Sequence, residues 1–415
     1  MKMIFVIPDM SWLYDYKSQF PLGILYLSSV LEEEGWDIEI FDSNIYSIET
    51  IPDAEVYAFS VVYDTYLSTI NLARRIRDKY PNSLLIAGGV DVTTEDSKFS
   101  DDFNCIFIGE SEDLIKEFTQ DFKHNRVKKF YKQKHPVDIT NLLPNRHILD
   151  DEYIRTPSIF TNNKVYCEGG ATSIMFSRGC PSNCIFCCSP KLYKRRVRFR
   201  SIHSIRNEIV DIINDYGIFQ FRIQDDTFTL KKSFLRQLTE RIKDLPIFYR
   251  CSTRADAIKE KRIVKSLFES GCREVGIGVE AIDNNILRML GKQETVEQME
   301  KAIAILRLYP IEIRCFFMIG TPFDTEELMH KNIEFIEKNK IAHATVTNFI
   351  PYPGTEIYDK KSEYGIIDIK DKPCMNIASH IELSPNITCE GIKREKHIKI
   401  MKIFYDYLLE KGHIT

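Results

Sequence analysis

The sequence predicts an α/β protein with two parallel-sheet units in succession and a short helical extension at the C-terminal end. Over the first part of the chain, short apolar runs alternate with helical patterns, as in doubly wound sheets. Further on, six apolar runs alternate with five helical patterns within about 185 residues, whereas an eight-fold barrel takes roughly 250. A six-unit partial barrel therefore fits the second unit. The 415 residues also exceed one ordinary domain.

We place the doubly wound unit at residues 1–130, a linker at 131–168, the partial barrel at 169–360 and the helical extension at 361–415. Strands in the first unit are predicted at 2–7, 37–42, 54–60, 84–89 and 105–110, with helices at 21–35, 71–78 and from about 112. The ligand of such a sheet lies beyond the C-terminal ends of its strands.

In the second unit, strands are predicted at 171–176, 219–223, 247–252, 274–280, 311–320 and 344–349. Helices are predicted between them at 204–216, 233–244, 263–270, 296–306 and 325–337, and a closing helix at 392–409. Polar residues follow each strand, and the C-terminal strand ends of a barrel are where its chemistry is expected.

Composition and charge exclude several classes of function. The formal net charge of -4 gives no basic footprint for nucleic acid. No run of about 18 apolar residues appears, so no membrane span is expected. The chain starts with a strand pattern, without a secretory signal, and has 11 cysteines. Reduced thiols in the cytoplasm are therefore expected.

A loop in the second unit carries three cysteines in a Cys-x3-Cys-x2-Cys array: Cys180, Cys184 and Cys187. Three thiolates at this spacing can converge on one metal centre, and thiolates are the usual protein ligands of a [4Fe–4S] cluster. Three ligands leave one iron open for a small molecule. Structural zinc is the alternative, but it usually takes a second Cys or Cys/His pair. We expect the adjoining Cys188 to be a packed small residue.

The cysteine array resembles the signature of the radical SAM superfamily, whose fold is a six-unit partial barrel. The resemblance implies that the open iron binds S-adenosylmethionine and that one electron cleaves it to methionine and a 5′-deoxyadenosyl radical. Phe186 stands where this family places an aromatic residue against the adenine. The implied cofactors are the [4Fe–4S] cluster and S-adenosylmethionine.

Two further strand ends of the partial barrel match this family. The segment 224–229 resembles the Asp-Asp-x-Phe-Thr of cobalamin-type members, at the strand end that contacts the methionine amino group. Two adjacent carboxylates there are unlike core residues, because buried acids need partners. We favour Asp225 over Asp226 as the cofactor contact. Glu280 ends an apolar strand, and the resemblance implies a contact to the ribose or amino group.

Ser252 and Arg254, at the end of the third barrel strand, are candidates for holding polar groups of the cofactor. A guanidinium fork suits a carboxylate such as that of the methionine moiety. A salt bridge from Arg254 to Asp256 is the equally strong alternative.

The first unit resembles the Rossmann-like, cobalamin-binding domain that precedes the barrel in many radical SAM enzymes. The implied corrin contacts lie at strand ends: Ser60, Gly88, Gly89, Gly109 and Glu110. Glycines there let a ligand approach the backbone closely. After the glycine pair this family often has Pro-His, whereas this chain has Val90-Asp91. A Rossmann-like domain without cobalamin therefore stays open as the alternative.

These patterns favour a cobalamin-dependent radical SAM enzyme that methylates an unactivated carbon of a biosynthetic substrate. No catalytic side chain is assigned beyond the cluster and the cofactors. The expected partners are a small-molecule or peptide substrate and an external electron donor such as flavodoxin or ferredoxin. A non-methylating radical SAM enzyme, which rearranges, dehydrates or cyclises its substrate with or without cobalamin, is the alternative. A non-catalytic iron–sulfur or zinc protein is a third hypothesis.

Overall fold

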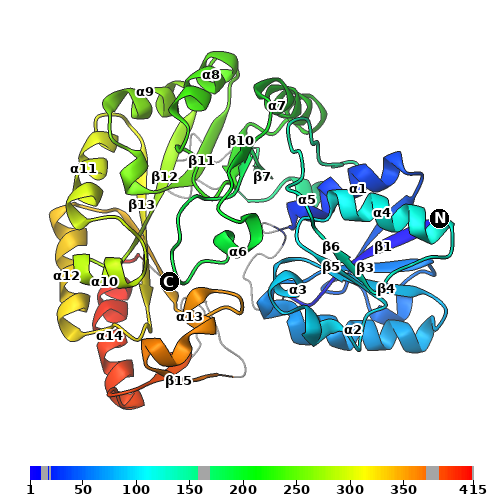
Figure 1. Cartoon of the computed structure of the whole chain (residues 1–415). Coiled ribbons are helices and arrows are strands. Elements are labelled where there is room, and N and C mark those ends of the chain that lie inside the picture. Colours follow the sequence, from blue (N-terminus) through cyan, green and yellow to red (C-terminus); the bar gives the residue numbers. More distant parts are fainter. Residues whose placement is uncertain (11–16, 18–19, 158–168, 371–382, 414–415) are drawn as a thin grey trace.

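Two six-stranded parallel sheets lie side by side in the computed structural model of the chain, which describes residues 1–10, 17, 20–157, 169–370 and 383–413 (Figure 1). The described residues contain no helix that is both long enough and apolar enough to cross a membrane.

The first sheet has the strand order β2-β1-β3-β4-β5-β6, and all of its strands run parallel. Its strands are β1 Lys2–Ile7, β2 Asp37–Asp42, β3 Val56–Ser60, β4 Leu84–Gly88, β5 Cys105–Ile108 and β6 Phe130–Lys132. Its main helices are α1 Leu22–Glu33, α2 Tyr66–Lys79 and α4 Glu112–Lys123. This is the order of a doubly wound sheet whose chain reverses direction between β1 and β3.

Both faces of this sheet are covered, which explains why its strands read as continuous apolar runs. Along β1, Ile4 and Val6 belong to the core under α2, whereas Met3, Phe5 and Ile7 belong to the core under α1 and α4. The period-two alternation of a strand thus supplies two cores from one short segment.

Strand β6 was not predicted, because the first unit was expected to end at residue 130 and a linker to begin at residue 131. Its side chains alternate, so that Tyr131 is buried while Phe130 and Lys132 are exposed. The Tyr131 ring stacks on Phe107 with the ring centroids 5.0 Å apart, and its strand pairs with β5. A three-residue edge strand with one buried residue is too short to give a periodic signal.

The second sheet has the order β14-β13-β12-β11-β10-β7, so each strand pairs with the next large strand of the chain. Its strands are β7 Ala171–Ile174, β10 Gln220–Ile223, β11 Phe248–Thr253, β12 Cys272–Glu280, β13 Glu312–Ile319 and β14 His343–Asn348. The helices between them are α7 Ile202–Tyr216, α8 Lys232–Ile242, α9 Lys261–Glu269, α11 Val296–Leu306 and α12 Glu326–Lys338. Six strands and five crossover helices confirm the predicted count.

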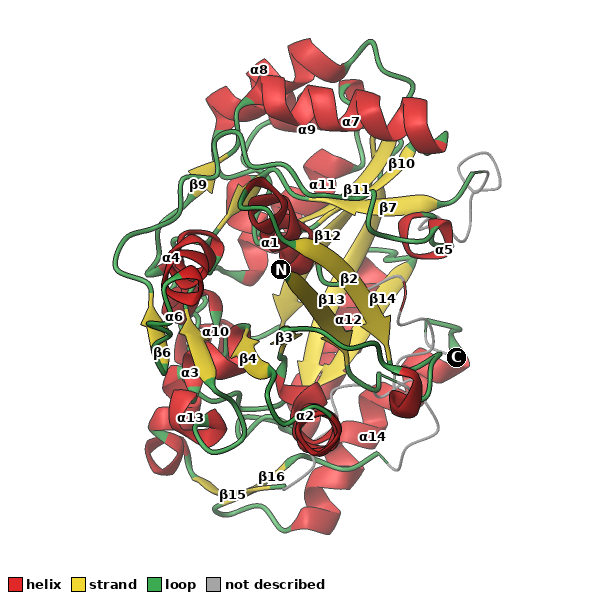
Figure 2. Ribbon diagram, turned by 90° about the vertical axis from the view of Figure 1, so that its right-hand side faces the viewer, coloured by secondary structure: helices red, strands yellow, loops and turns green. Residues whose placement is uncertain are grey.

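The crossover helices α8, α9, α11 and α12 lie on the side of this sheet that faces away from the first unit (Figures 1 and 2). A single core joins them to the strands. The opposite side of the sheet is therefore left to the loops that follow the strands, and these loops face the first unit.

Short elements that the sequence did not predict lie in the loops of both units and in the linker between them. They are α3 Val90–Thr94, α5 Asp151–Ile154, β8 Ser177–Arg178, α6 Ser189–Tyr193, β9 Arg198–Phe199, α10 Asn284–Met289 and α13 Glu356–Asp359. The C-terminal extension is not wholly helical, because β15 Ile366–Ile369 and β16 Ile387–Cys389 form an antiparallel pair before α14 Arg394–Glu410. Helix α14 packs on α12.

Candidate cluster and cofactor site

The cysteine loop leaves the end of β7 and is braced by a small hairpin. Strand β8 pairs with β9, and this pairing returns the chain to the base of the loop. Gly179, at a φ of 95°, packs directly against the backbone carbonyl of Arg196, so a Cβ at this position would clash. Only glycine fits this turn, which places Cys180 at the mouth of the partial barrel.

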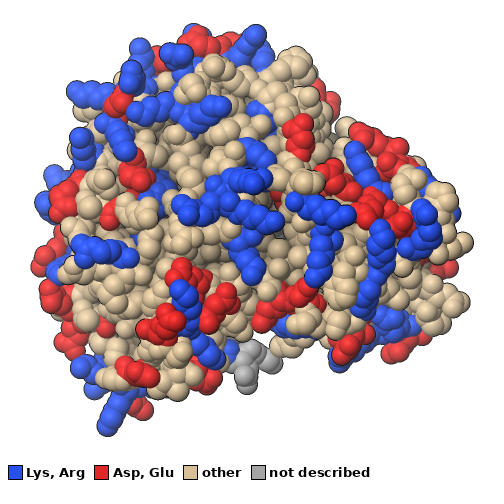
Figure 3. Space-filling view, in the orientation of Figure 1, with Lys and Arg blue, Asp and Glu red and all other residues tan. Residues whose placement is uncertain are grey.

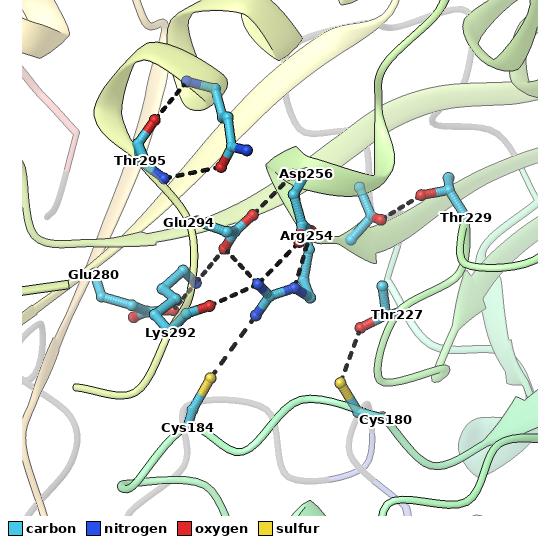
Figure 4. Close-up of polar contacts among 12 residues, drawn as sticks. Cys180, Cys184, Thr227, Thr229, Arg254, Asp256, Glu280, Lys292, Glu294 and Thr295 are labelled. Atoms are coloured by element: carbon cyan, nitrogen blue, oxygen red, sulfur yellow. Dashed lines mark hydrogen bonds and ion pairs between the residues drawn. The ribbon is translucent and has the colours of Figure 1, made fainter. Parts of the chain in front are cut away.

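Cys180, Cys184 and Cys187 line one cavity of about 280 Å³. The rest of its wall comes from the strand ends of the barrel and includes Phe186, Asp226, Ser252, Arg254, Glu280 and Lys292. In Figure 4 the thiols of Cys180 and Cys184 point toward these strand ends. The structure thus brings together seven of the sequence-predicted residues around one space: the three cysteines, Phe186, Ser252, Arg254 and Glu280.

The thiols suit a multi-iron cluster by their number and placement. Among the described residues, no group of three His, Cys, Asp or Glu side chains could hold a single metal ion. Three thiols distributed around one cavity instead suit a cluster in which each thiolate binds its own iron. Burial raises the pKa of Cys184, and that of Cys187 to about 12, so these thiols must lose protons when a metal binds.

Cys188 stands apart from this set. It does not line the cluster cavity, and Asp91 of α3 is among the groups that raise the pKa of its thiol, after burial itself. Cys188 is partly buried, and its place outside the ligand set stays a prediction.

Arg254 joins the third barrel strand to the cysteine loop. Its Nη1 lies 3.8 Å from Cys184 Sγ. Its Nε and Nη2 donate to the two oxygens of Asp256 at 3.0 and 3.2 Å, and Nη2 also donates to the carbonyl of Lys292 at 2.6 Å. The salt bridge to Asp256, which was the alternative interpretation of Arg254, is therefore present, and it orients the guanidinium toward the cavity.

Lys292 and Glu294 are site residues that the sequence analysis missed. Lys292 Nζ lies 3.1 Å from Glu280 Oε1 and 3.3 Å from Glu294 Oε2, and all of the Glu294 side chain is buried (Figure 4). The signal available was a Lys-x-Glu pair between α10 and α11, in a loop on the C-terminal side of the barrel. Nothing in that pattern shows which acids the lysine contacts.

Glu280 adopts a φ of 64°, a left-handed conformation that is uncommon for a residue other than glycine. The pairing of β12 with β13 shifts register between Gly278 and Glu280. A Cβ on Gly278 would lie 2.7 Å from Glu280 Oε1 and 3.0 Å from Lys292 Nζ. The glycine thus makes room for the ion pair over the cavity, and strained backbone of this kind is common at ligand sites.

The two aspartates of the second barrel strand have different environments. Asp225 is buried behind the cavity, where its carboxylate accepts hydrogen bonds from Phe176 N at 2.8 Å and from the Ser177 hydroxyl. Asp226 lines the cavity and accepts from Gly179 N at 2.9 Å. We favoured the Asp225 side chain from sequence. In the structure that carboxylate instead accepts hydrogen bonds from the segment that leads into the cysteine loop. A buried charge needs these two donors.

A second cavity of about 260 Å³ lies between the two units, at the C-terminal edge of the first sheet. Ser60, Gly89, Gly109 and Glu110 line it, and Leu192 and Tyr193 of α6 close it from the barrel side. Gly88 is not part of its wall. A Cβ on Gly88 would instead lie 3.4 Å from Phe107 Cβ.

Ion pairs across this cavity fasten the two units together. Arg178 of β8 lies 3.0 Å from Glu110 Oε1 and 2.6 Å from Glu112 Oε1, and Arg198 of β9 lies 2.8 Å from Glu110. Glu110, which was expected to contact a corrin, thus forms ion pairs across the domain interface. Tyr26 is also part of this wall, but its hydroxyl is buried and has no hydrogen-bond partner among the described residues.

Comparison with known proteins identifies the second unit. The profile described as "Radical SAM superfamily" matches residues 174–336, which contain the cysteine loop and the strand ends of the site. The chain carries a radical SAM domain. The profile match confirms the superfamily that was predicted from the cysteine loop.

A relative of this radical SAM enzyme along nearly its whole length is the "Uncharacterized methyltransferase PH0819" of Pyrococcus horikoshii. The two are 29% identical over 418 residues, which cover 95% of this chain and 87% of the relative. The similarity therefore extends over the first unit as well as the barrel.

Two solved structures share the fold. OxsB, described as a cobalamin-dependent S-adenosylmethionine radical enzyme, superposes with a TM-score of 0.70 at 16% identity, covering 98% of this chain and 67% of that one. TsrM from Kitasatospora setae, a radical S-adenosylmethionine methyltransferase with cobalamin and a [4Fe–4S] cluster bound, gives a TM-score of 0.66 at 15% identity, covering 88% of this chain and 75% of that one.

Proposed function

We propose that this radical SAM enzyme holds a [4Fe–4S] cluster on Cys180, Cys184 and Cys187, binds S-adenosylmethionine beside it, and methylates an unactivated carbon with cobalamin from the interdomain cavity. When bound, these cofactors supply the electron, the radical and the methyl group. The protein contributes ligands, orientation and the exclusion of water.

The observation that carries the proposal is the shared cavity of the three thiols and the polar strand ends. Its wall offers a cation at Arg254, a carboxylate at Glu280 and an aromatic face at Phe186. S-adenosylmethionine presents a carboxylate, an amino group with ribose hydroxyls, and an adenine, so each wall group has a complementary partner. The cluster cysteines form the floor of the same cavity.

The support for cobalamin comes from the relatives and from the place of the second cavity. OxsB and TsrM share the fold across both units, and their descriptions name cobalamin. In this chain the cavity lies at the C-terminal edge of the first sheet, where doubly wound sheets bind ligands.

Matched cysteine variants test the cluster. Cys184→Ala and Cys188→Ala each remove one partly buried thiol of the same loop, but only Cys184 lines the cavity. After anaerobic reconstitution we expect Cys184→Ala to lose most of its iron and all formation of 5′-deoxyadenosine, and Cys188→Ala to retain both. Equal iron in the two variants would contradict the assignment.

A non-methylating radical reaction is the second candidate, and the segment after the glycine pair favours it. Asp91 of α3 is buried with no hydrogen bond to either carboxylate oxygen among the described residues, and its nearest cation, Lys98 Nζ, lies 3.7 Å away. The corrin absorbance of protein produced with cobalamin, together with transfer of labelled methyl groups from S-adenosylmethionine, separates the two candidates.

A further inference from the structure

A turn of exposed cations adjoins the back of the cysteine loop. Lys191 lies on helix α6, and Lys194, Arg195 and Arg196 come directly after the end of that helix. We call these four residues the basic turn. All four are exposed. In Figure 3, Lys and Arg side chains gather at the middle of the face where Figure 1 shows α6.

The basic turn is built onto the cluster loop. Lys194 and Arg195 have φ values of 50° and 59°, two successive left-handed residues that are not glycine. Such a conformation is strained for a residue with a side chain and persists only where its surroundings impose it. Here Arg195 Nε donates to the carbonyl of Pro181 at 2.9 Å, and the backbone of Arg196 packs on Gly179. The turn is therefore fixed to residues on both sides of Cys180.

Its positive charge is not neutralised within the described part of the chain, where no acidic side chain forms an ion pair with any of the four cations. The neighbouring Arg198, by contrast, is paired with Glu110. The whole chain has a formal net charge of -4, so the basic turn is a positive site on a weakly acidic protein.

The four cations also lie outside both cavities. The cluster cavity and the interdomain cavity include other residues of this segment, Pro190, Leu192 and Tyr193, but none of the four basic side chains. Their charges are therefore available to a binding partner that approaches the cluster from outside the protein.

We propose that the basic turn is the docking surface for an acidic one-electron donor protein, a flavodoxin or a ferredoxin, and this rests on the proposed function. One electron leaves the reduced flavin or iron–sulfur centre of the donor and enters the cluster, and no bond forms or breaks in that step. Pro181, which accepts from Arg195, is bonded to Cys180, so the docked donor approaches the cluster through one residue of chain.

Electrostatics suit such a transient complex. Redox partners form small interfaces, and complementary charge accelerates their encounter in a salt-dependent way. Four cations on one turn suffice for such an encounter. Nucleic acid would require a longer basic surface and a basic domain, which this chain lacks.

The test compares charge reversals on two faces. One variant carries Lys191→Glu, Lys194→Glu and Arg196→Glu, and Arg195 is kept because it anchors Pro181. The control carries Lys396→Glu, Lys399→Glu and Lys402→Glu, the same change of charge on exposed positions of α14. A milder variant, Lys191→Gln, Lys194→Asn and Arg196→Gln, guards against misfolding, since asparagine tolerates the left-handed conformation.

Reduction of the reconstituted cluster is followed by stopped-flow absorbance with a reduced flavodoxin of negative net charge, and in parallel with dithionite. At low ionic strength we expect the flavodoxin rate constant to fall about tenfold or more in the reversal variant and less in the milder one. The α14 control should stay within about twofold of the wild-type enzyme, and the difference should shrink as salt screens the charges. Iron content and the dithionite rate should not change.

An equal fall in the α14 control, an unchanged rate in the reversal variant, or a parallel loss with dithionite would overturn the docking surface. Binding of a single-stranded oligonucleotide that depends on the basic turn, with flavodoxin reduction unaffected, would also overturn it. Failure of the wild-type protein to assemble a reducible cluster would instead reject the proposed function, and it is visible before any variant is compared.

Discussion

Arg254 Nη1 lies 3.8 Å from Cys184 Sγ while the rest of the guanidinium is held by Asp256 and by the carbonyl of Lys292. The planar fork leaves Nη1 free to face the thiol. A thiolate at Cys184 would be stabilised by this cation, and a buried ligand charge needs such a partner. The contact also connects the cysteine loop to the end of β11 and to the loop between α10 and α11, so the cluster and cofactor parts of the cavity share one support.

Arg254→Lys keeps the charge but loses the fork, so it cannot contact Cys184, Asp256 and the Lys292 carbonyl together. We expect the cluster to be retained about 10-fold less tightly, the lower end of the usual effect of an outer partner of a metal ligand. Loss of iron to a chelator measures this. Arg206→Lys alters an exposed bidentate pair with Asp244 and serves as the control. Equal iron loss from both variants would contradict the role of Arg254.

Lys292 compensates two acids, the fully buried Glu294 and the partly exposed Glu280. Lys292→Met removes that charge, and we expect the apoprotein to lose about 3–5 kcal/mol of unfolding free energy, because Glu294 then keeps one cation, Arg254 at 3.5 Å, beside its hydrogen bond from Asp256 N. Urea unfolding checks this. Adding Glu294→Gln should restore part of the loss, since the neutral amide needs no counter-ion. If the double variant is as unstable as the sum of the single variants, the two residues do not interact.

The sequence predicted the large elements well where burial imposes a period or a continuous apolar run. Strand β1 was predicted with the same bounds, 2–7, because both of its faces are buried. Helix α6 was missed because five residues that include Pro190 give no periodic pattern. Strand β6 was missed because only one of its three residues, Tyr131, is buried.

The site was predicted where a motif fixes the spacing along the chain, as for Cys180, Cys184 and Cys187. It was not predicted where side chains far apart in sequence meet. The ion pair between Lys292 and Glu280 depends on the φ of 64° at Glu280 and on the room above Gly278. Neither property can be read from residue type. The same holds for the burial of Asp225 behind the cavity that Asp226 lines, and the contact of Asp225 with the cofactor stays a prediction.

The domain interface depends on Arg178, whose side chain contacts Glu110 and Glu112 of the first unit. In Arg178→Met, Glu110 keeps Arg198, but Glu112 is left as a buried, unpaired acid. We expect a loss of about 3–5 kcal/mol in unfolding free energy and faster proteolysis between the units. Glu112→Gln in the same background should recover part of it. Arg75→Met, at an exposed pair with Glu49, should change stability by less than about 1 kcal/mol.

Asp225 gives the apoprotein a distinctive dependence of stability on pH. Burial raises its pKa from 3.8 to about 6, against the lowering effect of hydrogen bonds from Ser177 and Phe176. A carboxyl group whose pKa is higher in the folded state binds its proton more tightly there. Its contribution to stability is therefore greatest below pH 3.8, falls as the pH rises toward 6, and is constant above that.

Asp225→Asn should remove this dependence, because the amide oxygen can accept from Phe176 N and the amide nitrogen can donate to the Ser177 hydroxyl. Between pH 4 and pH 7 we expect the unfolding free energy of the variant to rise by roughly 2 kcal/mol relative to the wild-type protein, as urea titrations at each pH would show. Asp244→Asn should change in the opposite direction, since its hydrogen bond from Arg206 holds the pKa of Asp244 below its usual value. A difference for Asp225→Asn that is flat with pH would mean that Asp225 ionises in the folded protein as readily as in the unfolded chain.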